Sequence, residues 1–304
     1  MREWSPELVV DEAFARRLIS DRFPDVGTRS LTLLAEGWDN AVWVAEDGWA
    51  FRFPQRELGV RGLARELDVL PRLAPLLPLA VPVPELRGVP TGDYPWPFFG
   101  FRLVPGHEAA LAGLDDDART RLAPPLAEFL RTLHDRGAAV VAGLDVPVDP
   151  LGRGDPTIRV PRIRQRLVEL EELRLGPAAK AFEPLLAAAE ALPPAPRVQV
   201  LVHGDLHARH LLVDAAGTPT GVIDWGDLCL ADPSVDLSLV WSLMPRPARS
   251  EFEAAYGPID EATHVRARML AVHLCASLAV YARAEGLTAL EHESLAGLER
   301  ARTG

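Results

Sequence analysis

Two short clusters of ionisable residues constrain this chain most, because each lies next to a short apolar run. The clusters are His203-Gly204-Asp205-Leu206-His207 and Ile223-Asp224-Trp225-Gly226-Asp227. Turn formers lie between them, namely Asp214, Gly217 and Pro219. The pattern predicts a hairpin of two short strands with Asp205 at one end and Asp224 at the other. Two carboxylates that meet near neutral pH repel each other unless a cation lies between them, so the pair predicts a divalent metal site beside a catalytic base.

Length and composition narrow the class of protein. A chain of 304 residues is long enough for one large or two medium domains. Its net charge of −11 argues against a nucleic-acid partner. Cys229 and Cys275 form no CxxC motif, which disfavours disulfides and zinc–cysteine sites. Residues 1–12 hold no apolar signal core, and no run of about 18 apolar residues follows, so we expect no membrane segment and a cytoplasmic location.

The order of predicted elements gives a fold class. We expect a helix over 11–23, strands within 29–53 joined by an Asp47-Gly48 turn, a helix over 60–73 and a strand over 98–104. The second half reads as helical, with an exposed helix over 161–175 and further helices over 235–243, 262–285 and 288–302. We expect its only strands to be the pair that carries the carboxylates. The sequence therefore predicts an α+β fold with a small β-rich lobe and a larger helical lobe.

The two clusters resemble motifs of the aminoglycoside phosphotransferase family, a branch of the protein-kinase-like fold. Residues 203–207 match the catalytic-loop motif of that family, and Ile223-Asp224-Trp225 resembles its metal-binding D-F-G counterpart. Asp232-Pro233 and Asp236-Leu237 resemble its downstream pair. The resemblance spans residues 30–245. It implies a bilobal fold, with a nucleotide-binding lobe over 1–104 and a catalytic and acceptor-binding lobe over 105–304.

The resemblance also implies roles for single residues. Asp205 would accept the proton of the attacking hydroxyl or orient it, and His207 would lie near the γ-phosphate. Asp224 would hold Mg²⁺ on the phosphates of ATP or GTP. For His203 the implied role is a structural hydrogen bond in the loop, and Asp236 would brace the backbone of the catalytic loop.

His210 departs from the family pattern, which has Asn at this position. Magnesium prefers oxygen ligands, and imidazole suits it poorly. Either His210 binds the metal through a compromise, or only one metal ion is held tightly. Macrolide kinases of the superfamily tend to carry Gly-His here in place of Gly-Asn. This chain has Arg209-His210, so half of that pattern points away from a typical aminoglycoside kinase.

A nucleotide-binding lobe of this kind needs a cation on its third strand, where kinases have a lysine paired with a helix glutamate. The single lysine of this chain, Lys180, lies far from that strand, and Arg52 takes the position. Glu66 lies on an apolar helix face, where a carboxylate is costly to bury unless it is paired. We therefore predict an Arg52–Glu66 ion pair, with the guanidinium reaching the α- and β-phosphates.

Two further segments are predicted to contact the nucleotide. Gly37, Asp39 and Asn40 would form the turn that covers the phosphates, and Arg102, Leu103 and Val104 would form the hinge that meets the purine base. We expect the tryptophans nearby to serve core packing, namely Trp38, Trp43, Trp49 and Trp96.

The favoured hypothesis is a kinase that phosphorylates a hydroxyl of an antibiotic-like small molecule, either an aminoglycoside or a macrolide. Choline, homoserine and amino sugars stay open as acceptors, and we expect the acceptor pocket within residues 150–195 and 255–300. One alternative is a nucleotide-binding pseudokinase, because the usual lysine and Asn are missing. The other is a zinc- or iron-dependent hydrolase whose ligands would come from the five His and Asp side chains of the clusters, namely His203, Asp205, His207, His210 and Asp224.

Overall fold

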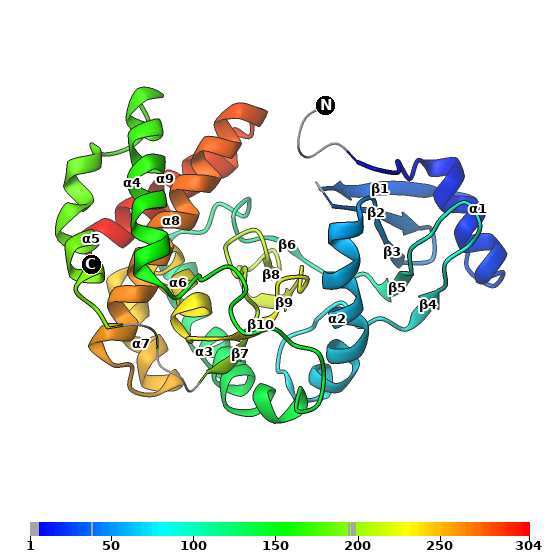
Figure 1. Cartoon of the computed structure of the whole chain (residues 1–304), viewed down its shortest axis with the longest axis horizontal. Helices are drawn as coiled ribbons and strands as arrows, with labels where there is room; N and C mark the ends of the chain where they lie inside the picture. Colours follow the sequence, from blue (N-terminus) through cyan, green and yellow to red (C-terminus); the bar gives the residue numbers. More distant parts are fainter. Residues whose placement is uncertain (1–5, 38, 194, 196–198) are drawn as a thin grey trace. The chain divides into compact units, whose positions relative to one another are not determined.

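The computed structural model describes residues 6–37, 39–193, 195 and 199–304. They form two compact units, which are traced by sequence colour in Figure 1. The first unit contains the chain up to Leu76, then Ala80–Val104 and Asp224–Asp227. The second contains Leu77–Leu79, Pro105–Ile223 and Leu228–Gly304. Asp224 and Trp225 of the segment that resembles D-F-G therefore pack with the first unit, although the neighbouring Ile223 and Leu228 belong to the second.

The first unit is built on a five-stranded antiparallel sheet with the strand order β1-β2-β3-β5-β4. Gly48 has a φ of 82° in the β2–β3 turn, a conformation that favours glycine. The predicted helices, hairpin and strand of this region are all present. The strands are β1 (Leu31–Glu36), β2 (Asn40–Ala45), β3 (Trp49–Pro54), β4 (Leu86–Gly88) and β5 (Phe98–Arg102), and the helices are α1 (Glu12–Arg22), α2 (Glu57–Leu73) and the 3₁₀ helix η1 (Ala74–Leu76).

Alternation along β3 divides the core of this unit between two helices. Phe51 and Phe53 pack with the buried face of α1, whereas Ala50 packs with Leu63 of α2 on the other side of the sheet. Trp43 is buried, and its indole N–H donates to the Val10 carbonyl at 3.0 Å. Two more of the predicted packing tryptophans contact the same core, namely Trp49 and Trp96. Trp38 lies outside the described residues.

The second unit is mainly helical, as predicted. Its helices are α3 (Asp116–Val140), α4 (Pro156–Glu172), η2 (Ala179–Phe182), α5 (Glu183–Glu190), α6 (Ser234–Leu243), α7 (Arg246–Tyr256), α8 (Glu261–Glu285) and α9 (Thr288–Thr303). Its strands are β6 (His107–Glu108), β7 (Val200–Val202), β8 (Leu211–Val213), β9 (Pro219–Val222) and β10 (Cys229–Ala231), paired in the orders β6-β8-β9 and β10-β7.

The predicted carboxylate hairpin is wrong in its pairing. The hairpin consists of β8 and β9, and the Asp214 N–H donates to the Thr218 carbonyl at 2.9 Å to close its turn. The strand before Asp205, β7, pairs with β10 instead. The loop from β8 to β9 is shorter than the loop that would join β7 to β9, so closing it costs less conformational entropy. The described part of the second unit therefore has five strands, where two were predicted. Asp205 and Asp224 do not lie at the two ends of one hairpin.

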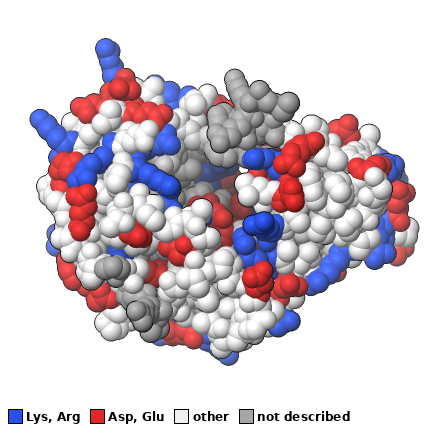
Figure 2. All heavy atoms as spheres, viewed as in Figure 1, with Lys and Arg blue, Asp and Glu red and all other residues white. Residues whose placement is uncertain are grey.

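Two helices of the second unit differ from expectation. The predicted exposed helix, α4, buries one face that holds Val160, Ile163, Leu167 and Leu170 against the core around α8. α8 is long and apolar enough to cross a membrane by length and composition, but 56% of its most apolar window is buried inside the unit, as in the core helix of a soluble domain. On the face drawn in Figure 2, basic and acidic side chains are interspersed.

Candidate active site

Arg52 links two carboxylates in the first unit. Its Nη1 lies 2.9 Å from Glu66 Oε1, and its Nη2 lies 3.0 Å from Asp224 Oδ1. Glu66 is fully buried, whereas the Asp224 side chain is half exposed. The predicted Arg52–Glu66 pair is confirmed. The contact with Asp224 was not predicted, because nothing in the local sequence brings β3 and residue 224 together.

The pKa values of this cluster follow from burial and from the pairing. Burial raises the pKa of Glu66 to about 7, although the Arg52 charge opposes the shift. Burial alone would lower the pKa of Arg52, but Glu66 and Asp224 outweigh it and raise that pKa. The guanidinium therefore stays charged and holds both carboxylates in place.

Close backbone packing fixes the segment that carries Asp224. A Cβ on Gly62 of α2 would lie 2.9 Å from the Gly226 carbonyl oxygen, so only glycine permits this approach. Arg65 Nη2 donates to the same oxygen at 2.6 Å. Asp224 itself has a φ of 63°, a left-handed conformation that is costly outside glycine and is often found at functional sites.

The predicted phosphate-covering turn is closed by its own contacts. The Gly37 N–H donates to the Asn40 carbonyl at 2.9 Å, and Arg56 pairs with Asp39 at 3.0 Å. Gly37 and Asp39 lie between β1 and β2, and Asn40 is the first residue of β2. A role for this turn in nucleotide binding stays a prediction.

The predicted hinge residues turn toward the β2–β3 hairpin. The Arg102 guanidinium lies 3.8 Å from the centre of the Trp49 ring and donates to the Asp47 carbonyl at 3.0 Å. The Leu103 N–H donates to the Gly48 carbonyl at 3.2 Å. Since the Leu103 amide is used inside the first unit, a contact with a purine base would fall to Val104 or to backbone carbonyls.

Asp205, His207 and His210 form a cluster in the second unit. The distance from Asp205 Oδ2 is 3.6 Å to His207 Nε2 and 3.8 Å to His210 Nδ1. One ligand atom of each residue lies within 4.8 Å of the other two, so the three side chains are close enough to share a metal ion. His210 Nδ1 also lies 2.7 Å from the Asp205 carbonyl oxygen, which only accepts hydrogen bonds. Nδ1 of His210 therefore carries a proton, and in the neutral ring Nε2 is the nitrogen that can bind a metal.

The backbone of this loop is held by buried polar side chains. Asp236 accepts hydrogen bonds from the His203 and Gly204 amides at 2.8 and 3.1 Å, and His203 Nε2 donates to the Ile223 carbonyl at 2.9 Å. The predicted structural roles of His203 and Asp236 are thus confirmed. Two supporting residues were missed: His134 Nε2 lies 3.3 Å from Asp236, and Tyr256 OH lies 2.7 Å from His134 Nδ1. Both belong to helices without a recognisable motif.

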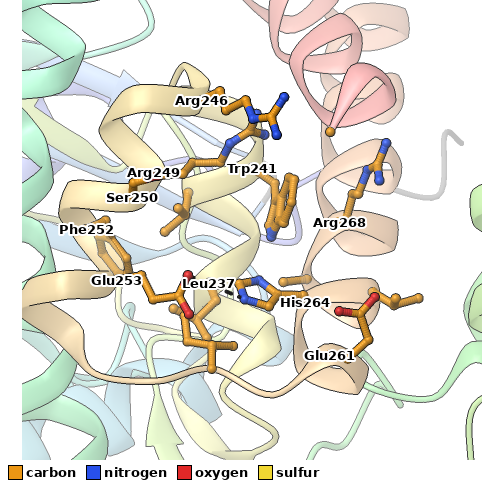
Figure 3. Close-up of a pocket in the computed structure, with 15 residues that line it drawn as sticks. Leu237, Trp241, Arg246, Arg249, Ser250, Phe252, Glu253, Glu261, His264 and Arg268 are labelled. Carbon is orange, nitrogen blue, oxygen red and sulfur yellow. Dashed lines mark ion pairs between the residues drawn. The ribbon is translucent and has the colours of Figure 1, made fainter.

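A pocket of about 310 Å³ lies among α6, α7 and the start of α8 in the second unit (Figure 3). The guanidinium groups of Arg249 and Arg268 lie 4.4 and 5.4 Å from the centre of the Trp241 ring. Burial, together with the charges of Arg268 and Arg246, lowers the pKa of Arg249 to about 10. The positive charges of these arginines repel one another, and cation–π contacts with the Trp241 ring offset part of that repulsion.

Comparison with known proteins identifies the family of this chain. The family model for the phosphotransferase enzyme family, APH, matches residues 30–270. The chain belongs to this family. That result confirms the resemblance and the predicted phosphotransferase activity with an alcohol group as acceptor.

Individual relatives agree with this assignment. The chain is 33% identical over 137 residues to the aminoglycoside 3'-phosphotransferase of Streptomyces ribosidificus, which is 45% of this chain and 49% of that protein. It superposes on the GDP and kanamycin complex of APH(2")-IIia with a TM-score of 0.69 and 26% identity, over 95% of this chain and 98% of that one. The macrolide 2'-phosphotransferase MphH from Brachybacterium faecium gives a TM-score of 0.61 and 25% identity, over 93% and 97% of the two chains. The α+β protein-kinase-like fold is therefore confirmed.

Proposed function

We propose that this phosphotransferase transfers the γ-phosphate of ATP or GTP to a hydroxyl of an antibiotic-like small molecule of the aminoglycoside or macrolide class. The single observation that carries the proposal is the Arg52–Glu66–Asp224 cluster. In protein kinases the strand-cation–helix-glutamate pair and the metal-binding aspartate must both be in place for activity. Here one guanidinium contacts both carboxylates. The names of the relatives, which include a kanamycin complex and a macrolide kinase, support the acceptor class.

The first unit would bind the nucleotide. Arg52 would contact the α- and β-phosphates with its planar group, while Glu66 holds the guanidinium in position. The Asp224 carboxylate is a ligand of the type that Mg²⁺ prefers, and the metal would neutralise charge on the transferring phosphoryl group. The turn of Gly37, Asp39 and Asn40 would cover the phosphates, and residues 102–104 would meet the base.

The second unit would supply the acceptor chemistry. Asp205 would accept the hydroxyl proton while the acceptor oxygen bonds to the γ-phosphorus and the bond from that phosphorus to the bridging oxygen breaks, releasing ADP or GDP. His207, at 3.6 Å from Asp205, would lie near the γ-phosphate. His210 would offer Nε2 to a second, weakly held metal ion. We place this activity in the cytoplasm, with no nucleic-acid or membrane partner.

A nucleotide-consumption screen tests the proposal. Wild type and the Asp205→Asn variant are each incubated with Mg²⁺ and with ATP or GTP in separate runs, against aminoglycosides, macrolides, choline, homoserine and amino sugars. We expect acceptor-dependent release of nucleoside diphosphate by wild type alone. Nucleotide binding without turnover of any acceptor would instead indicate a pseudokinase. Stoichiometric bound zinc together with ester or amide hydrolysis would indicate the hydrolase.

A further inference from the structure

A second cavity of the second unit, of about 510 Å³, is lined by α4 and α8. We name it the arginine pocket after its most prominent side chains. Its lining residues are Arg162, Gln165, Arg166, Glu169, His273 and Ser277. The apolar face of α4 packs against α8 in the same core, which gives the pocket a fixed floor.

Positive charge exceeds negative charge around the arginine pocket. Arg162 makes no ion pair or side-chain hydrogen bond within the described part of the chain, and Arg166 pairs with Glu169. Arg159, next to them on the same helix face, is buried and donates to the carbonyls of Gly152 and Leu151 rather than to a carboxylate. A protein with a net charge of −11 thus keeps Arg162 without a carboxylate partner among the described residues.

The pKa of His273 is lowered by burial and by the arginines around the pocket. Arg159 Nη1 lies 3.3 Å from His273 Nε2, and because a guanidinium only donates, Nε2 must accept. Burial, together with the charges of Arg159, Arg166, Arg162 and Arg153, lowers the pKa of His273 to about 4. The ring is therefore neutral at pH 7, with its proton on Nδ1, and that buried N–H has no hydrogen-bond partner among the described residues.

The arginine pocket adjoins the catalytic loop through α8. His273, Ser277 and Tyr281 follow one another at intervals of four residues, so they lie one above the next on the helix. Tyr281 and Ala208 pack against the same small core of Ala110, Ala282 and Leu290. The Tyr281 ring centre lies 6.0 Å from the guanidinium of Arg209, which lies in the catalytic loop between His207 and His210. At about 1.5 Å per residue, Ser277 lies roughly 6 Å along the helix from this contact.

The other pocket lies at the far end of the same helix. Its α8 residues are Glu261, His264, Val265, Ala267 and Arg268. Figure 3 labels Glu261, His264 and Arg268 of these. Arg268 lies roughly 20 Å along the helix axis from Tyr281 at about 1.5 Å per residue. Of the two pockets, the arginine pocket is therefore the one within reach of a molecule that also contacts the catalytic loop.

We propose that the arginine pocket binds the acceptor and selects one that carries a carboxylate or phosphate group beside its hydroxyls. This inference rests on the phosphoryl transfer to a hydroxyl that is proposed above, but it changes the acceptor class, because aminoglycosides and macrolides carry amines and not carboxylates or phosphates. The planar group of arginine matches a carboxylate or phosphate with two parallel hydrogen bonds, and His273 adds a neutral donor. A polyamine such as kanamycin would meet repulsion here. The acceptor would thus be an acidic hydroxylated molecule and not a polyamine.

Binding of two size-matched sugars tests the pocket without requiring turnover. The probes are trigalacturonate, which is anionic, and the trimer of glucosamine, which is cationic, measured by calorimetry at low ionic strength. We expect wild type to bind trigalacturonate about tenfold more tightly, the effect of two partly screened charge contacts. The double variant Arg162→Glu/Arg166→Glu should reverse the order.

Arg164→Glu is the matched control. Arg164 lies on the same helix but pairs with Glu183 and Glu190, so its reversal should leave both affinities unchanged while thermal unfolding verifies that each variant folds. Equal affinities in wild type, tighter binding of the glucosamine trimer, or an equal loss in Arg164→Glu would each overturn the inference.

The acceptor screen separates this inference from the proposed function. With an acidic acceptor that is turned over, the double variant should raise the acceptor KM and leave kcat and the nucleotide KM unchanged. Turnover of polyamines with a KM that the double variant does not alter would refute the pocket and leave the proposed function standing. The expected sugar preference without turnover of any acceptor would refute the proposed function and the acceptor role, and leave only an anion-binding pocket.

Discussion

The charged clusters of the two units are held by different forces. In the first unit, the permanently charged Arg52 contacts Glu66 at 2.9 Å and Asp224 at 3.0 Å. In the second unit, Asp205 lies 3.6 and 3.8 Å from two imidazole nitrogens, on a loop whose backbone Asp236 binds. A cluster held by fixed charges loses stability and binding when one member is removed. A cluster held through its backbone keeps its shape and loses turnover instead.

Asp205→Asn should show the largest effect on activity. The amide keeps the shape of the side chain but cannot accept the hydroxyl proton, so kcat should fall by about a hundredfold or more. Steady-state kinetics with the acceptor found in the screen measure this loss. Nucleotide affinity and the melting temperature should stay near wild type, because Asp236 still binds the loop backbone. Near-normal turnover would remove Asp205 from the role of base or orienting group.

Arg52→Met should affect the first unit in the opposite way, with loss of both stability and nucleotide affinity. Removal of the cation takes away the charge that stabilises the buried Glu66 carboxylate, which should cost on the order of 1–3 kcal/mol at a pH above the Glu66 pKa of about 7. Arg52→Lys should restore part of the affinity, since lysine supplies the charge without the planar fork. Urea unfolding and nucleotide titration measure the two losses. An unchanged unfolding midpoint in Arg52→Met would contradict a stabilising ion pair.

The pH dependence of stability sharpens the test on Glu66. Its pKa is about 7 in the folded protein, above the ordinary glutamate value of 4.5, so the fold binds more protons than the unfolded chain between these values. The contribution of Glu66 to stability is therefore full below pH 4.5 and is lost as pH rises through 7. In Arg52→Met the opposing charge is gone, so the pKa rises further and destabilisation should be greater near pH ~8 than near pH ~5. The double variant Arg52→Met/Glu66→Gln should lose this difference.

The sequence predicted those parts of the molecule that depend on a local residue pattern or on the free-energy cost of burying a charged side chain. Glu66 lies on an apolar helix face, so the cost of burying it predicted that it needs a cation, and the kinase pattern of a third-strand cation pointed to Arg52. The contact of Arg52 with Asp224 joins residues 172 positions apart and needs the packing of Gly62 against Gly226, which no local pattern encodes. The hairpin was mispaired because the three residues of β8 were too few to be recognised as a strand.

α4 shows a second kind of failure. Its charged residues suggested an exposed helix, yet Val160, Ile163, Leu167 and Leu170 recur at helical spacing and form a buried stripe. The stripe was readable in the sequence but was outweighed by the arginines between its members. The roles of His134 and Tyr256 were not readable, because a polar side chain in a helix reveals its partner only in the packed structure.

His210→Asn should have a smaller effect than either charge variant. Asn supplies an oxygen ligand, which magnesium prefers to imidazole. We expect the Mg²⁺ concentration for half-maximal activity to stay the same or to fall. Since Asn can replace the imidazole as a ligand, kcat should stay within roughly a few-fold of wild type. A magnesium titration of both proteins at saturating nucleotide measures this. A large loss of activity that magnesium does not restore would show that the imidazole itself is required.

Tyr256→Phe should give the smallest effect, and a matched variant in the first unit makes it informative. His134 Nε2 donates to Asp236, so Nδ1 must accept from the Tyr256 hydroxyl at 2.7 Å. Deleting that hydroxyl should cost about 1 kcal/mol of stability and lower kcat slightly, because Asp236 binds the catalytic loop. Tyr94→Phe deletes a hydroxyl of the first unit, which donates to the Pro54 carbonyl at 2.7 Å. It should cost similar stability in urea unfolding and leave kcat unchanged. Equal kcat values in the two variants would show that His134 stabilises the second unit without positioning the loop.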